Sequence, residues 1–183
     1  MTLTKRQWIM FTLFIIELAY VLFTAALSGS LLDIASSLSR LLFLGALYLE
    51  NNYNSKRILL LAGVWLIVGM IFQLMQVLPI IIANLSVFSV FDLSILVLLY
   101  VGIYLFSMKY YNGNFYNKKE NIIITLLVIP TILFGFYNLY LFLTLPIISN
   151  PIALSYTFMG ILSRMIIPLA ITTYTWLRHK NIE

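Results

Sequence analysis

Six long apolar stretches constrain this chain more than any other feature of its sequence. Each has about the 20 mostly apolar residues that a helix needs to cross a bilayer. All are continuously apolar, whereas strands of a membrane β-barrel alternate over about 10 residues. The sequence therefore predicts an all-α polytopic membrane protein, with six transmembrane helices in one bundle and one domain over residues 1–183. The stretches are 8–27, 31–49, 58–78, 87–108, 122–144 and 152–176.

Composition excludes a soluble protein and several kinds of site. The chain is 62% apolar and 9% charged, against roughly 45–50% and about 25% in soluble domains. With no cysteine and one histidine, disulfides, cysteine-bound metals and multi-histidine sites are excluded. We expect no cofactor and no bound metal. The first stretch loosely resembles a secretory signal peptide, whose removal would leave five helices, but it is too long and Glu17 interrupts it.

The basic residues outside the apolar stretches alternate along the chain. They fall in the N-terminal segment, the second and fourth connections and the C-terminal segment, and none falls in connections 28–30, 79–86 and 145–151. Positively charged residues remain on the cytoplasmic side of a membrane. We therefore expect a multi-pass protein of the cell membrane with both termini in the cytoplasm. The residues are Lys5, Arg6, Lys56, Arg57, Lys109, Lys118, Lys119, Arg178 and Lys180.

The net charge of +5 has a second consequence. The positive charge should attract the protein to the anionic lipids of the bilayer. Because the basic residues are thinly spread over four short segments, we expect no binding of nucleic acid. The high content of Asn, Ile, Tyr and Lys suggests an AT-rich bacterial genome.

Four ionisable residues lie well inside the predicted spans: Glu17, Arg40, Asp92 and Arg164. Such residues are costly in a bilayer and are functional hypotheses by default. Glu17 stands twelve residues before Gly29 and Arg40 eleven after it, so an antiparallel hairpin brings them level and predicts an ion pair. That pair either fixes the register of the hairpin or belongs to a ligand- or proton-coupled site.

The second stretch carries a polar stripe on one face. Asp33, Ser36, Ser37 and Arg40 follow i, i+3, i+4, i+7 spacing, which places them on one side of a helix. That side should point into the bundle. Asp33 is equally well placed to cap the helix N-terminus.

The fourth and sixth stretches carry the other two charges. Asp92 is predicted about 7–8 Å below the outer end of its helix, at 1.5 Å per residue. It is either functional or a structural partner of Arg164 or of a backbone group. Pro168 follows Arg164 at i+4 and frees the Arg164 carbonyl. Pro130 lies at the same depth in the fifth stretch, so the two prolines predict a hinge, or kinks that the fold tolerates.

The polar residues of the spans gather in their outer halves. The inner halves are nearly pure hydrocarbon. The residues of the outer halves are Asp33, Ser36, Ser37, Gln73, Gln76, Asp92, Ser94, Asn138 and Tyr156. This asymmetry predicts a polar pocket open to the outside, floored by Glu17, Arg40 and Arg164, above a sealed inner half. A simple channel is disfavoured, because a pore needs polar residues along its full depth.

The sequence favours ligand capture over catalysis. No nucleophile, metalloprotease, P-loop or dinucleotide motif is present, so we expect no enzyme, although a lipid-active enzyme or scramblase is a minor alternative. The leading hypothesis is capture or transport of a small molecule from the outer side, with or without a membrane partner subunit. The main alternative is an accessory, sensor or immunity protein that binds a partner through its lipid-facing surfaces or through connection 109–121. The ligand-binding candidates are Glu17, Arg40, Gln73, Gln76, Asp92 and Arg164.

Overall fold

The computed structural model describes residues 4–27, 31–49, 53–83, 87–113, 117–144 and 151–179. Over these ranges the chain is all-helical and contains no strand. Four of the helices (α1, α4, α5 and α6) are long and apolar enough to cross a membrane by length and composition. The helices are α1 (Lys5–Leu27), α2 (Leu31–Tyr48), α3 (Tyr53–Ala83), α4 (Val87–Asn112), α5 (Lys118–Thr144) and α6 (Pro151–His179).

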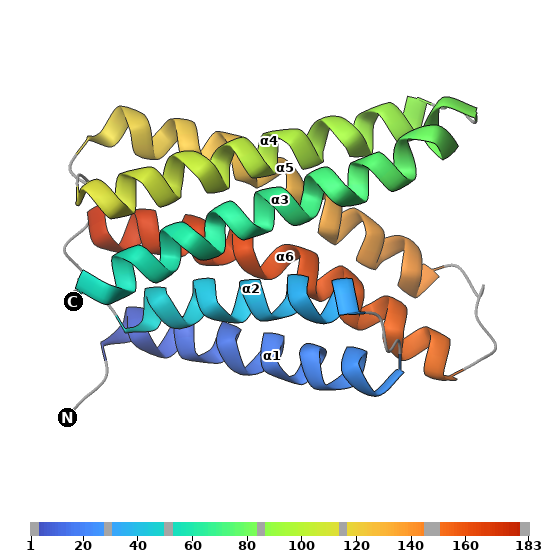
Figure 1. Cartoon of the computed structure of the whole chain (residues 1–183), viewed down its shortest axis with the longest axis horizontal. Coiled ribbons are helices and arrows are strands. Elements are labelled where there is room, and N and C mark those ends of the chain that lie inside the picture. The colour runs from blue at the N-terminus through green and yellow to red at the C-terminus, as the bar shows by residue number, and fades with distance from the viewer. Residues whose placement is uncertain are drawn as a thin grey trace.

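The six helices form a closed antiparallel bundle (Figure 1). Each helix packs against its neighbours in the chain, and α1 also packs against α6, which closes the ring. The last helix in addition touches α2 and α4. Because α1 begins and α6 ends at the same side of the bundle, we call that side the terminal half and the opposite side the distal half.

The helices extend beyond the predicted spans mainly in the terminal half. The first begins at Lys5 rather than at residue 8, because a capping box starts it there. The Thr4 amide donates to Gln7 Oε1 at 3.0 Å, and the Gln7 amide donates to Thr4 Oγ1 at 3.3 Å. A span predicted from hydrophobicity stops at the first charged residues, whereas the helical hydrogen bonding continues through them.

Two predicted connections are shorter than expected. Pro79 was expected outside the third helix but lies inside α3, as prolines do in membrane helices whose neighbours satisfy the freed backbone groups. The connection predicted over residues 109–121 is wrong at both ends, since α4 runs to Asn112 and α5 begins at Lys118. Gly113 adopts a φ of 73° directly after α4, a left-handed conformation that commonly follows the end of a helix.

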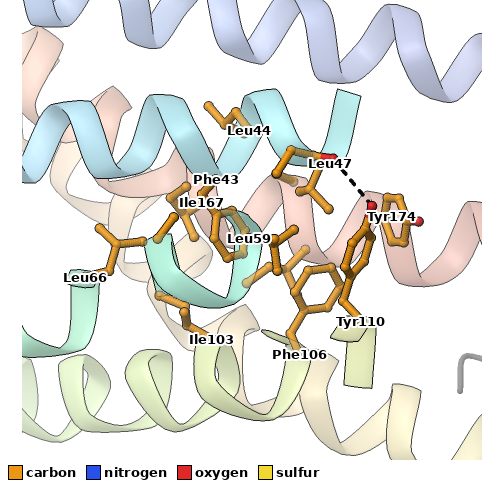
Figure 2. Close-up of a cluster of buried hydrophobic side chains, with 14 of the residues drawn as sticks. Phe43, Leu44, Leu47, Leu59, Leu66, Ile103, Phe106, Tyr110, Ile167 and Tyr174 are labelled. Carbon is orange, nitrogen blue, oxygen red and sulfur yellow. Dashed lines mark hydrogen bonds between the residues drawn. The ribbon is translucent and has the colours of Figure 1, made fainter. Parts of the chain in front are cut away.

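A large apolar cluster fills the terminal half (Figure 2). The Tyr110 hydroxyl donates to the Ala46 carbonyl at 3.4 Å, and the Phe106 and Tyr174 rings meet edge to face with centroids 5.8 Å apart. This packing fills the terminal half with apolar side chains; whether it seals that half stays a prediction. Its members include Met10, Phe43, Leu44, Leu47, Leu59, Leu66, Ile103, Phe106, Tyr110, Ile167, Ile171 and Tyr174.

Candidate functional site

A set of polar side chains lies next to the apolar cluster at the middle of the bundle. Helical spacing puts them there: Arg40, Tyr100 and Arg164 each stand three residues on the distal side of a cluster member on their own helix. We call this set the polar layer. It consists of Glu17 on α1, Ser37 and Arg40 on α2, Tyr100 on α4, and Ser163 and Arg164 on α6.

The predicted ion pair between Glu17 and Arg40 is confirmed. Arg40 Nε donates to Glu17 Oε1 at 2.6 Å; the Arg40 side chain is 19% exposed and the Glu17 side chain 0%. Arg40 Nη2 donates to Ser37 Oγ at 2.9 Å, and its guanidinium lies 5.5 Å from the centre of the Tyr20 ring. The ion pair joins α1 to α2, and the two charges neutralise each other.

A third helix completes the environment of the buried carboxylate. The Ser163 hydroxyl lies 3.3 Å from Glu17 Oε1 and 3.1 Å from Oε2, to which it donates. Ser163 was not among the predicted site residues. The sequence held one signal for it: the tripeptide Leu-Ser-Arg occurs twice, at residues 38–40 and 162–164, and the second copy contains Ser163.

Arg164 lies where the packed interior ends. Ile167 and Ile171, on the same face of α6, are 4% and 0% exposed and belong to the apolar cluster. One turn further on, Arg164 is exposed. Within the part of the chain that the structure describes, its guanidinium has no hydrogen bond and no ion pair. A side-chain carbon at Gly160, one turn further still, would meet no atom within 4 Å, so the space on this face is open.

Tyr100 lies at the edge of the apolar cluster, where its half-buried side chain packs against cluster members. It stands three residues before Ile103 on α4, as Arg40 and Arg164 stand three residues before Phe43 on α2 and Ile167 on α6. Sequence reasoning missed Tyr100, because a tyrosine in a membrane span is common and only its depth sets this one apart.

Asp92 is not part of the polar layer. It is half-buried and shares its face of α4 with the buried Ile95 and Leu99. A stretch of eight residues separates it from Tyr100, or about 12 Å along the helix. Among the described residues it forms no ion pair with Arg164, so that structural pairing is wrong; the backbone alternative stays open.

Several predicted site residues are placed only in part. The side chains of Asp33, Ser36, Gln73, Gln76 and Tyr156 lie outside the described residues, although their backbones belong to α2, α3 and α6. Both predicted hinge prolines, Pro130 in α5 and Pro168 in α6, stand inside unbroken helices. The Thr172 hydroxyl donates to the Pro168 carbonyl at 2.6 Å. The hinge itself stays a prediction.

A second polar cluster lies at the end of the terminal half, between α4 and α5. The Lys109 ammonium, on a side chain that is 5% exposed, lies 3.1 Å from Glu120 Oε2. It also donates to Asn121 Oδ1 at 2.7 Å and to the Asn117 carbonyl at 3.2 Å. These contacts pin the start of α5 against α4, and they have a structural role.

Among the described residues, the polar layer contains one arginine with side-chain partners and one without. Arg40 is held by Glu17 and Ser37, whereas the exposed Arg164 presents five donors in a planar fork suited to carboxylate or phosphate. Across the described ranges, no three His, Cys, Asp or Glu side chains gather as a metal ion would require. No protein family matches the chain, and neither does any curated protein or solved structure.

Proposed function

We propose that this protein captures or transports a small water-borne ligand, which enters the distal half of the bundle and stops at the polar layer. One observation carries the proposal: the face of α6 that is buried at Ile167 and Ile171 is exposed at Arg164 and open at Gly160. An arginine without a partner in the middle of a membrane helix is costly. Water and a ligand in the distal half would reduce that cost.

The distal half faces the outside of the cell in this proposal. The support is the alternation of basic residues, which favours a cytoplasmic position for both termini. The ligand would then meet the protein from the extracellular side and would find the cytoplasmic side closed by the apolar cluster. Transport requires this cluster to open, and the prolines Pro130 and Pro168 are the proposed hinge.

The alternative of an accessory protein that binds a partner has less support. Its candidate surfaces were the lipid-facing sides of the helices and the connection between α4 and α5. At that connection, the Lys109 ammonium bonds the Asn117 carbonyl and Asn121 Oδ1, so these groups are engaged within the protein.

The absence of cysteine from the sequence allows a direct test by single-cysteine labelling in intact cells. Gly160→Cys places a thiol in the proposed opening, where the structure has room for it. We expect rapid modification by a membrane-impermeant methanethiosulfonate reagent added outside the cells. The readout is the loss of later labelling by a thiol-reactive fluorophore after the protein has been solubilised.

Two control variants place the cysteine where the reagent should not reach it or should not react with it. Ile171→Cys lies in the closed half, where the native side chain is 0% exposed. Leu133→Cys replaces an apolar side chain that is 63% exposed on α5, where we expect lipid to surround it and to keep the thiol un-ionised. Both should stay unmodified. A Gly160→Cys protein that reacts no faster than these controls overturns the proposal.

A further inference from the structure

The charges of the polar layer do not cancel. Glu17 and Arg40 neutralise each other across 2.6 Å, and Arg164 adds one positive charge that the described residues leave unpaired. We propose that the ligand is a small anion, and that its carboxylate or phosphate group binds the Arg164 guanidinium. This inference rests on the proposed function and names the substrate class of the same site.

Arg164 is the cation available to an anion, and Arg40 is not. The Arg40 fork is already used by Glu17 and Ser37, and Glu17 is held in turn by Ser163. This network fixes Arg40 as a structural cation, whose attraction for a further anion is offset by the adjacent carboxylate. None of the described residues bonds the Arg164 fork, whose charge and donor groups suit the paired hydrogen bonds that strengthen anion binding.

The anion reaches the site from water rather than from a lipid headgroup. Arg164 stands thirteen residues after Pro151, where α6 begins, which is about 20 Å along the helix at 1.5 Å per residue. A hydrocarbon core is about 30 Å thick, so Arg164 lies deep in it, whereas lipid phosphates stay at its edge. A small soluble anion can travel that distance through an open distal half.

Asp92 does not bind the anionic group itself. It lies about 12 Å along α4 from Tyr100 at 1.5 Å per residue, and its carboxylate would repel an anion. A ligand that carries a cationic or hydrogen-bond-donating group at its other end would satisfy both residues.

The test compares two thiol reagents of similar size and opposite charge on the Gly160→Cys protein. One carries a sulfonate and the other a trimethylammonium group, each attached through a methanethiosulfonate. Because Arg164 lies one turn from Gly160, its charge should speed the sulfonate reagent and slow the ammonium reagent. We expect Arg164→Gln to lower the ratio of the two rates by about tenfold, from a Coulomb energy at intermediate dielectric. Arg164→Lys, which keeps the charge, should preserve the ratio.

The two proposals fail in different ways in this experiment. If neither reagent modifies Gly160→Cys, the open distal half, and with it the proposed function, is wrong. If both reagents react but the ratio of rates is the same with Arg164→Gln, the opening stands and the anionic ligand is wrong. Size-exclusion chromatography of each variant in detergent checks that it is folded before its rates are compared.

A protection experiment separates the two sources of an anionic group. It uses the protein in an uncharged detergent, with the sulfonate reagent on Gly160→Cys. Inorganic phosphate or acetate at millimolar concentration should slow the modification while sodium chloride at equal ionic strength does not. Protection by added phosphatidylglycerol, and not by phosphate or acetate, would overturn the assignment to a water-borne anion.

Discussion

The Ser163 hydroxyl donates to Glu17, with 3.1 Å between the hydroxyl and Oε2, although 146 residues separate the two in the chain. Together with the Arg40 ion pair, this contact joins α6, α1 and α2 around a carboxylate that is 0% exposed. A buried charge is tolerated when it is paired and hydrogen-bonded. The network therefore holds the two ends of the helix ring together at mid-depth.

Removing only one partner of the ion pair should cost more than removing both. Arg40→Gln leaves the Glu17 carboxylate buried and without its cation, which we expect to cost about 3–5 kcal/mol of unfolding free energy. Glu17→Gln combined with Arg40→Gln removes both charges and should recover most of that loss. Thermal unfolding in detergent measures both variants. A double variant no more stable than Arg40→Gln would contradict this account of the pair.

Close packing between α4 and α5 should make Gly102→Ala destabilising. A Cβ at Gly102 would lie 2.6 Å from Val128 Cγ1 and 3.3 Å from Leu127 Cβ. Val128 is 0% exposed and its branched side chain is stiff, so we expect a cost of about 1–3 kcal/mol from overpacking. Adding Val128→Ala should relieve the contact and raise the melting temperature again.

The matched control for this prediction is Gly160→Ala, because a Cβ there meets no atom within 4 Å. Its melting temperature should stay close to that of the wild type. Equal losses for Gly102→Ala and Gly160→Ala would point to a general loss of helix flexibility and not to the contact with Val128.

Loss of the Lys109 ammonium should loosen the start of α5. Lys109→Met keeps most of the side-chain volume but removes the bonds to Asn121 and Asn117 and the ion pair with Glu120. We expect faster amide exchange of Asn121, whose amide bonds the Asn117 carbonyl at 3.2 Å, as measured by hydrogen exchange with mass spectrometry. Lys119→Met, at an exposed position, serves as the control and should leave exchange unchanged.

Ligand binding should stabilise the wild-type protein against heat and fail to stabilise Arg164→Gln. A ligand at a hundredfold excess over its dissociation constant adds about 2.7 kcal/mol by mass action. A thermal-shift screen of carboxylates and phosphates therefore includes wild type, Arg164→Gln and Asp92→Asn side by side. A compound that shifts all three proteins equally binds elsewhere and contradicts the proposed roles of both residues.

The sequence predicts the parts of this fold that depend on local pattern. Six helices follow from hydrophobicity, and the pairing of Glu17 with Arg40 follows from their equal distance to one tight turn. The contacts of Ser163 and Tyr100 depend instead on how α6 and α4 rotate about their axes, which packing across the whole bundle decides. Lys109 was misplaced for a similar reason: a lysine beside an apolar span suggests solvent, and only the fold brings Asn121 to it.

The ring of sequential neighbours sets an order of events during synthesis. Each new helix can pack against the one made just before it, so the wall of the bundle grows in chain order from α1 to α5. The last helix brings Ser163 and Arg164 together. Glu17 is made first, and its hydrogen-bond donor Ser163 follows only with α6, after four more helices. Arg164, which has no partner among the described residues, comes at the same late stage, when the other five helices are already present.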